Sequence, residues 1–257
     1  MLNKGVNPRF FLVTFDKLYN KVIERLSFEE VEKITCYCVQ KKVSKNISEK
    51  IVDTINEWEL SWNDYSFQTK QYYEYGAMVH ILQNPELLDG VTHVGLLHYD
   101  VIFNEGSVNS MISELVKKPD TIFYQQRRPN NQTSLSRFEA ERLCELMSSK
   151  MGINIDVTSA WNDGWVSEAL SLTPKHVFSK FAKFLHDHHL EIENILKTNR
   201  WGIMNICPHR ICGIVERMWG FYLVGCGLPL KQMDVIHDWD SYQHHHMLMN
   251  GTGLTNL

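Results

Sequence analysis

The chain lacks the long apolar run, the excess of one charge and the cysteine spacing that would assign it to several protein classes. No stretch of its 257 residues approaches the ~20 apolar residues of a membrane-spanning helix, so we expect no membrane span. The formal net charge is only −4 with both signs interspersed, which argues against nonspecific nucleic-acid binding. The N-terminal segment has one short apolar run and no small-residue cleavage site, so we expect no signal peptide.

The cysteines also lack the pairing that would close a structural metal site. They lie in or beside apolar runs, at Cys36, Cys38, Cys144, Cys207, Cys212 and Cys226. Cys36 and Cys38 alternate along one apolar segment, so both thiols would point to the same face. This pattern favours reduced core cysteines over disulfides and therefore a cytoplasmic protein.

Apolar residues, by contrast, are plentiful at 44% and fall into strand-like and helix-like segments. A strand over Arg9–Phe15, an amphipathic helix over Asp16–Leu26 and a strand over Ile34–Val39 would form a βαβ unit, which implies parallel pairing. No internal repeat and no linker is visible in the sequence. The pattern predicts a single α/β domain whose mostly parallel central sheet is flanked by helices.

The later segments continue this alternation. We expect helices over Asn63–Gln83, Ser107–Lys117, Arg137–Met151, Lys175–His188, Glu191–Asn199 and Ile214–Cys226. We expect strands over Val91–Phe103, Thr121–Gln125, Trp165–Leu172 and Leu230–His237, with a polar loop over Arg127–Ser136.

The strand over Val91–Phe103 changes character at His98-Tyr99-Asp100. In open α/β sheets, ligands bind at the carboxyl ends of parallel strands. A carboxylate there, Asp100, could hold Mn²⁺ or Mg²⁺ against a diphosphate, with His98 in the place of a second acid. A strand-to-loop transition that carries a polar pair by accident fits the same residues, and both interpretations stay open.

A second candidate site lies near the C-terminus. Val215-Glu216-Arg217 would open a helix, where the dipole favours an ionised carboxylate that could act as a general base. Arg217 could pair with Glu216 or with a phosphate. His237 ends the closing strand and could bind a metal or a phosphate. A solvated helix start and a strand-end histidine are the alternative interpretation.

Two further groups of residues are open to a functional and a plain interpretation. Trp161–Trp165 (WNDGW) contains a turn signal, and its tryptophans beside Asp163 are also typical of sugar sites. The histidines of His186–His189 and His244–His246 could bind zinc, although their spacing matches no closed structural site and a solvated surface is the simpler interpretation.

Two segments resemble a group of bacterial capsular-polysaccharide glycosyltransferases. Gln71–Gly76 (QYYEYG) is similar to that group's aromatic-Glu-Leu-Thr-Gly helix, and Val94–Tyr99 (VGLLHY) is similar to its Gly-Leu-x-His-Tyr motif. That group usually continues Arg-Arg, whereas this chain has Asp100-Val101. In this feature and in Phe11–Val22, the chain more closely resembles the small GT-A glycosyltransferases of chlorella viruses, which build glycans of the viral capsid protein. The resemblance covers nearly the whole chain, although each motif is individually loose.

The resemblance implies a GT-A fold, related to the Rossmann fold, that uses a UDP-sugar and a divalent ion, Mn²⁺ or Mg²⁺. It implies a uridine pocket lined by Thr14, Phe15, Asp16 and Gln40. It implies a diphosphate–metal centre with metal ligands and phosphate contacts among His98, Tyr99, Asp100, Arg217 and His237. It gives the role of base to Glu216, with Asp163 in reserve, for an inverting transfer to a hydroxyl of a glycan or glycoprotein acceptor.

The resemblance also implies a nucleotide-binding half over 1–105 and an acceptor-binding half over 106–257. The donor sugar would be a hexose or a pentose such as xylose, and the location would be the cytoplasm, of the host if the protein is viral. Two other functions fit the residues. One is a carbohydrate- or nucleotide-binding protein without catalysis, and the other is a zinc-dependent hydrolase that uses the histidine clusters.

Overall fold

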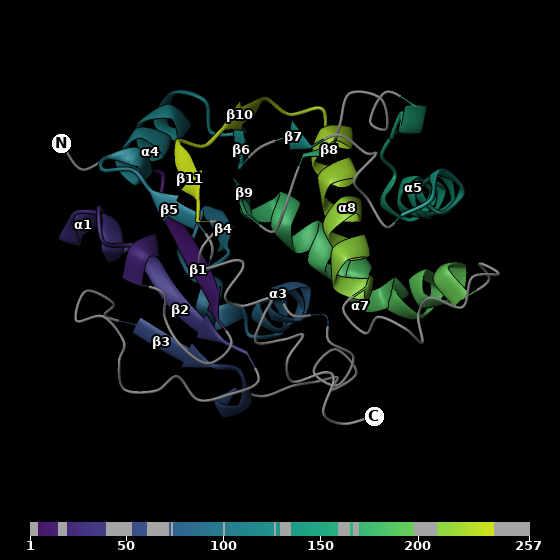
Figure 1. Ribbon diagram of the computed structural model, residues 1–257, viewed down its shortest axis with the longest axis horizontal. Coiled ribbons are helices and arrows are strands. Elements are labelled where there is room, and N and C mark those ends of the chain that lie inside the picture. The colour runs from purple at the N-terminus through teal and green to yellow at the C-terminus, as the bar shows by residue number, and fades with distance from the viewer. Residues whose placement is uncertain are drawn as a thin grey trace.

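A computed structural model shows how the chain folds (Figure 1). It describes residues 5–14, 20–39, 53–60, 72, 74–99, 101–125, 127–128, 135–158, 165–166, 170–197 and 210–238.

Seven strands form the central sheet, in the order β10-β6-β9-β4-β1-β2-β3. They are β1 (Pro8–Thr14), β2 (Ile34–Cys38), β3 (Asp53–Asn56), β4 (His93–Leu97), β6 (Ile122–Tyr124), β9 (Ser171–Pro174) and β10 (Leu230–Gln232). β9 runs antiparallel to its neighbours β4 and β6, and the other pairs within this sheet are parallel. A single α/β domain with a mostly parallel sheet is therefore confirmed.

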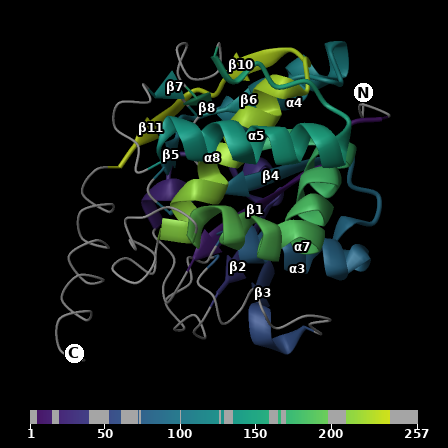
Figure 2. The same cartoon turned by 90° about the vertical axis from the view of Figure 1, so that its right-hand side faces the viewer.

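Helices cover both faces of this sheet (Figures 1 and 2). One face packs against α3 (Glu74–Gln83), α5 (Arg137–Met151), α7 (Lys175–Lys197) and α8 (Arg210–Gly225). The other face packs against the short helices η1 (Asn20–Val22) and α1 (Phe28–Val31) and against α4 (Ser107–Lys117). Two further short helices are η2 (Glu57–Glu59) and η3 (Pro85–Leu88).

Two small antiparallel ribbons lie beside the central sheet. β5 (Val101–Phe103) pairs with β11 (Val235–His237), and β7 (Arg127–Arg128) pairs with β8 (Trp165–Val166). Each ribbon joins segments far apart in the sequence, so its position depends on tertiary packing.

Strand β1 is buried on both faces, which explains its unbroken apolar sequence. Phe11 belongs to the core beneath α3 and α8, whereas Phe10 belongs to the core beneath α4. Phe10 lies opposite Gly95 of β4, where an added Cβ would come within 2.2 Å of the Phe10 ring. Glycine at this position is what lets the ring pack over the neighbouring strand.

The structure corrects several predicted helices. The described part of Asp16–Leu26 holds only the short helix η1, and α1 begins instead at a capping box formed by Ser27 and Glu30. The predicted break between residues 188 and 191 is wrong, because no proline or glycine interrupts the chain there and α7 runs straight through. In the described part of Asn63–Gln83, the helix begins at Glu74, and the rest lies mostly outside the described residues.

Three predicted strands are each divided in two. The divided segments are Val91–Phe103, Trp165–Leu172 and Leu230–His237. In each, one piece joins the central sheet and the other joins a ribbon, which hydrophobic periodicity alone does not distinguish. Strand β3 was not predicted. In the described part of the chain, no helix is both long and apolar enough to cross a bilayer.

Glu30 is a buried carboxylate that connects two helices. One oxygen accepts hydrogen bonds from the backbone N–H and the hydroxyl of Ser27, both at 3.1 Å, and so caps α1. The other oxygen accepts from the backbone N–H groups of Val108 and Asn109, at 3.1 and 3.2 Å, in the first turn of α4. A single carboxylate therefore satisfies donors at two helix N-termini.

We predict that Glu30→Gln lowers the free energy of unfolding by about 2–3 kcal/mol, because the amide would direct N–H groups at N–H groups. Urea unfolding followed by circular dichroism measures the change. The exposed neighbour Glu29 supplies the matched control, since Glu29→Gln should change stability by less than about 0.5 kcal/mol. Equal stability of the two variants would contradict the bridging role.

Candidate functional site

The candidate site lies at the carboxyl end of β4, where His98 directly follows the strand. Its Nε2 is 2.9 Å from Oε1 of Glu74, the first residue of α3. The second oxygen of Glu74, Oε2, accepts a hydrogen bond from the Cys212 thiol of α8 at 3.0 Å. Glu74 thus connects a strand end with two helices on the same face of the sheet.

Hydrogen bonds keep the Glu74 carboxyl ionised. Burial alone raises its pKa, but the bonds from His98 and Cys212 outweigh that effect and hold the pKa below the usual value. Burial, followed by the nearby Glu74 charge, raises the pKa of Cys212 well above its usual value. The thiol therefore stays protonated and acts as a donor to Glu74 rather than as a nucleophile.

Glu216 and Arg217 lie further along α8 and form an ion pair at 2.7 Å. The predicted helix start at Ile214 is wrong, because α8 begins at Arg210 and Glu216 lies beyond its first turn. The helix dipole, which acts within the first turn, therefore does not explain a charged Glu216, whereas the guanidinium of Arg217 provides a direct partner.

Tyr75 is buried close enough to both sets of charges to be affected by them. Burial first, and then the carboxylate charges of Glu216 and Glu74, raise its pKa well above the usual value. We call Glu74, Tyr75, Cys212, Glu216 and Arg217 the α3–α8 cluster. Of these residues, only Glu216 and Arg217 are predicted site residues, although Glu74 and Tyr75 belong to the segment Gln71–Gly76 that resembles the glycosyltransferase helix.

The ribbon of β5 and β11 brings His237 to the chain segment that follows β4. His237 lies opposite Val101 in the antiparallel register. Asp100, which precedes Val101, lies outside the described residues. Of the predicted ligands, His98 and His237 therefore come from segments that the fold brings to one region, at the carboxyl end of β4.

The predicted ligand set suits Mn²⁺ better than Mg²⁺, because imidazole nitrogen favours transition metals whereas Mg²⁺ prefers oxygen. His98 contributes through one nitrogen at most, since Glu74 engages Nε2. Among the described residues, no group of three His, Cys, Asp or Glu side chains is arranged to hold a metal ion. The set fits such an ion only together with Asp100.

Of the residues predicted to line the uridine pocket, only Thr14 lies within the described part of the chain. Thr14 ends β1 and is fully buried, with its hydroxyl 3.6 and 3.5 Å from the sulfurs of Cys36 and Cys38. This hydroxyl is directed at the core thiols rather than at solvent. Phe15, Asp16 and Gln40 lie outside the described residues, so the pocket stays a prediction.

The remaining predicted site residues are only partly placed. Tyr99 is buried, and its ring centroid lies 4.0 Å from that of His98. Asp163 and Trp161 lie outside the described residues, whereas Trp165 belongs to β8 and pairs with Arg128 of β7.

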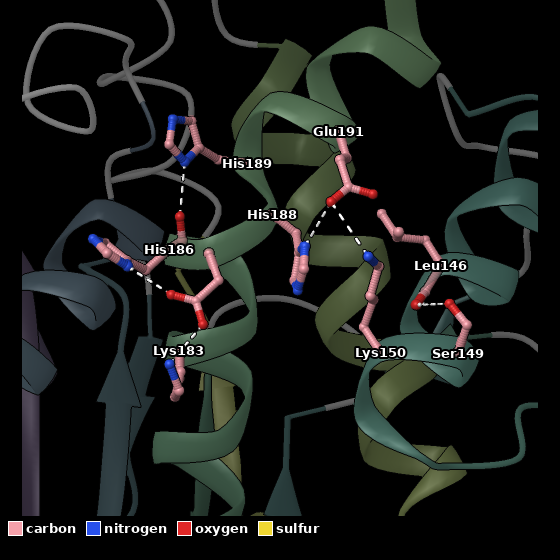
Figure 3. Close-up of polar contacts among 9 residues, drawn as sticks. Leu146, Ser149, Lys150, Lys183, His186, His188, His189 and Glu191 are labelled. Atoms are coloured by element: carbon pink, nitrogen blue, oxygen red, sulfur yellow. Dashed lines mark hydrogen bonds and ion pairs between the residues drawn. The ribbon is translucent and has the colours of Figure 1, made fainter.

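Three histidines of α7, His186, His188 and His189, are engaged in hydrogen bonds on the helix surface (Figure 3). His186 Nδ1 lies 3.0 Å from Asp187, and His188 Nδ1 lies 2.8 Å from Glu191. His189 Nδ1 contacts the carbonyl oxygen of His186 at 2.8 Å. These local partners favour the interpretation as a solvated surface, and His244–His246 lie outside the described residues.

No protein-family model matches the chain, and no curated protein matches it. Among solved structures, the apo WbbM bifunctional glycosyltransferase is similar with a TM-score of 0.59 and 13% identity, over 90% of this chain and 45% of WbbM. The mannosyltransferase Ktr4p from S. cerevisiae, in complex with GDP, has a TM-score of 0.41 and 10% identity, over 91% of this chain and 71% of Ktr4p. Core-mannan synthase A from Aspergillus fumigatus, in a Mn/GDP form, has a TM-score of 0.43 and 10% identity, over 91% of this chain and 75% of that protein.

The likeness to WbbM shows a shared fold, and this chain spans less than half of the WbbM length. Identity of 13% carries no information about which residues act. Function must therefore be argued from the site.

We predict that changing His186 and His188 together to Ala leaves the zinc content of the purified protein unchanged, because both rings have carboxylate partners on α7. Inductively coupled plasma emission spectroscopy of the dialysed protein measures the number of zinc ions per chain. Stoichiometric zinc in the unchanged protein that is lost in the double variant would instead show a zinc site at these histidines, which the zinc-dependent hydrolase requires.

Proposed function

We propose that the chain is a glycosyltransferase that moves a sugar from a UDP-sugar to a glycan or glycoprotein acceptor. The observation that carries the proposal is the pairing of β11 with β5, in which His237 lies opposite Val101, just after the end of β4. This arrangement supports a ligand site at the carboxyl ends of parallel strands, where α/β sheets bind nucleotides. The fold shared with WbbM is consistent with the proposal.

In this proposal each predicted residue keeps its role. Phe15, Asp16 and Gln40 line the uridine pocket together with the backbone of Thr14, whose side chain is directed into the core. Asp100, His98 and His237 hold Mn²⁺ or Mg²⁺, which when bound neutralises charge on the departing diphosphate. Tyr99 and Arg217 contact the diphosphate, and Arg217 is suited to this because a guanidinium presents paired donors.

Glu216 is the proposed base, with Asp163 in reserve. Its carboxylate would accept the proton of the acceptor hydroxyl while that oxygen attacks the anomeric carbon, and UDP leaves from the opposite face. This single displacement inverts the configuration at the anomeric carbon of the donor sugar. The 2.7 Å contact with Arg217 supports this role because it fixes where the carboxylate points.

The donor sugar in this proposal is a hexose or a pentose such as xylose. The resemblance to the viral enzymes further suggests that the product is a glycan of a viral capsid protein. The enzyme would then work in the cytoplasm of the host. The 1–105 half binds the nucleotide and the 106–257 half binds the acceptor.

We predict that UDP with Mn²⁺ raises the melting temperature by about 5 °C at ligand concentrations near 100 times Kd. GDP and TDP should raise it less, and Asp100→Ala should remove the Mn²⁺-dependent part because it deletes the carboxylate ligand. A thermal-shift panel of the three nucleotides and their sugars, with and without Mn²⁺, measures this. No stabilisation by any of them would overturn the proposal.

We predict that Glu216→Gln lowers kcat of transfer by about 10²–10⁴-fold, because the amide does not accept the proton. Stabilisation by UDP–Mn²⁺ should stay at the wild-type value, and Glu141→Gln on the exposed side of α5 serves as the control. Full activity of Glu216→Gln would move the role of base to Asp163. Binding of UDP-sugars without transfer to any acceptor, in the unchanged protein, would identify a sugar-nucleotide-binding protein instead.

A further inference from the structure

Glu74 is one of the three residues of the α3–α8 cluster, with Tyr75 and Cys212, to which the proposed function gives no role. It comes from the segment Gln71–Gly76, and His98 comes from Val94–Tyr99. The two segments that carry the sequence resemblance therefore meet in one contact, the 2.9 Å bond between Glu74 Oε1 and His98 Nε2.

This contact determines which nitrogen of His98 faces Glu74 and which faces away from it. A carboxylate only accepts hydrogen bonds, so the hydrogen between Glu74 and His98 belongs to Nε2. Nε2 is therefore occupied as a donor and has no lone pair for a metal ion. A ligand at the end of β4 would meet the Nδ1 edge of the ring.

The carboxylate itself is fixed from a second side. Cys212 of α8 donates its S–H to Oε2 at 3.0 Å, while the Glu74 backbone belongs to the first turn of α3. The His98 ring is further confined by Tyr99, whose ring centroid lies 4.0 Å away. With 18% of its side chain exposed, His98 is held mainly by the protein yet keeps some access to solvent.

We propose that Glu74 is a positioning residue that, supported by Cys212, fixes the His98 imidazole so that it acts on the diphosphate–metal centre through Nδ1. This inference rests on the proposed function. It agrees with a general feature of metal sites, in which a ligating histidine donates its other ring N–H to a carboxylate. It also assigns different tasks to the two carboxylates of the cluster, since Glu216 would accept a proton and Glu74 would only orient.

The first experiment measures the affinity for UDP–Mn²⁺ by isothermal titration calorimetry. We expect Glu74→Gln and Glu74→Ala to bind about 10- to 100-fold more weakly than wild type, as for other outer partners of metal-ligating histidines. Glu141→Gln should bind as wild type does. The Gln variant keeps an acceptor oxygen and a similar shape, so its thermal unfolding shows whether the loss occurs in a folded protein. Wild-type affinity in folded Glu74→Gln and Glu74→Ala would overturn the inference.

Cys212 offers a matched pair of variants. Cys212→Ser keeps a donor to Glu74, whereas Cys212→Ala removes it. We expect Ser to restore most of the affinity that Ala loses, a rescue that a purely space-filling role for the thiol would not produce.

His98 offers a second pair that separates its two nitrogens. The amide of His98→Asn can occupy the place of Nδ1, whereas the longer His98→Gln can reach Glu74 in the place of Nε2. We expect Asn to retain more UDP–Mn²⁺ affinity than Gln. The reverse order would show that the ligand engages Nε2 and would overturn the inference.

Nitrogen-15 NMR of histidine-labelled protein without ligand tests the contact independently of function. The His98 signals, assigned by their loss in His98→Gln, should show a hydrogen on Nε2, and they should shift in Glu74→Gln. If wild type binds no sugar nucleotide, the proposed function fails even when this spectrum is as expected. If wild type binds UDP–Mn²⁺ but the spectrum shows Nε2 without hydrogen, only the role of Glu74 fails.

Discussion

The common direction of the strands is the constraint on which the candidate site depends. In the central sheet, every described strand except β9 runs the same way, so β1, β2, β3 and β4 end at one edge. Residues that follow these strands are brought together regardless of their separation in sequence. β1 lies between β2 and β4, and its side chains belong to the apolar clusters on both faces of the sheet. Packing on both faces therefore holds these strand ends in place.

Apolar packing is not directional, and buried carboxylates supply direction at three points. Glu30 caps α1 and the start of α4, Glu74 joins α3 to β4 and α8, and Glu193 of α7 accepts from the Tyr72 hydroxyl at 2.9 Å. A buried charge without donors is strongly destabilising, so each of these sites favours the arrangement in which its donors are in place. In this way Glu30 and Glu193 fix how segments on each face of the sheet meet one another, and Glu74 fixes a helix against a strand end.

The sequence pattern predicted the βαβ-type sheet and helices such as Ser107–Lys117 and Arg137–Met151, whose bounds the structure reproduces. It did not predict that Val91–Phe103 would serve two sheets, because β4 and β5 are both apolar and periodicity reports burial rather than the partner strand. The predicted helix start at Ile214 was too late, because α8 begins at Arg210 and continues through Gly213, a residue of low helix propensity.

At the site, the sequence predicted His98 from its place after a strand, but it did not predict the partner of its ring. Glu74 stands in another segment, and only the packing of α3 against the sheet brings the carboxylate to Nε2. This partner changes what a histidine in the place of an acid could offer to a cation. An aspartate offers two equivalent oxygens to a cation, whereas a histidine held at Nε2 offers one nitrogen in one direction. In the proposed site, the histidine would therefore exchange charge for orientation. The negative charge would then lie behind the ring, on Glu74, which accepts a hydrogen bond from the Cys212 thiol.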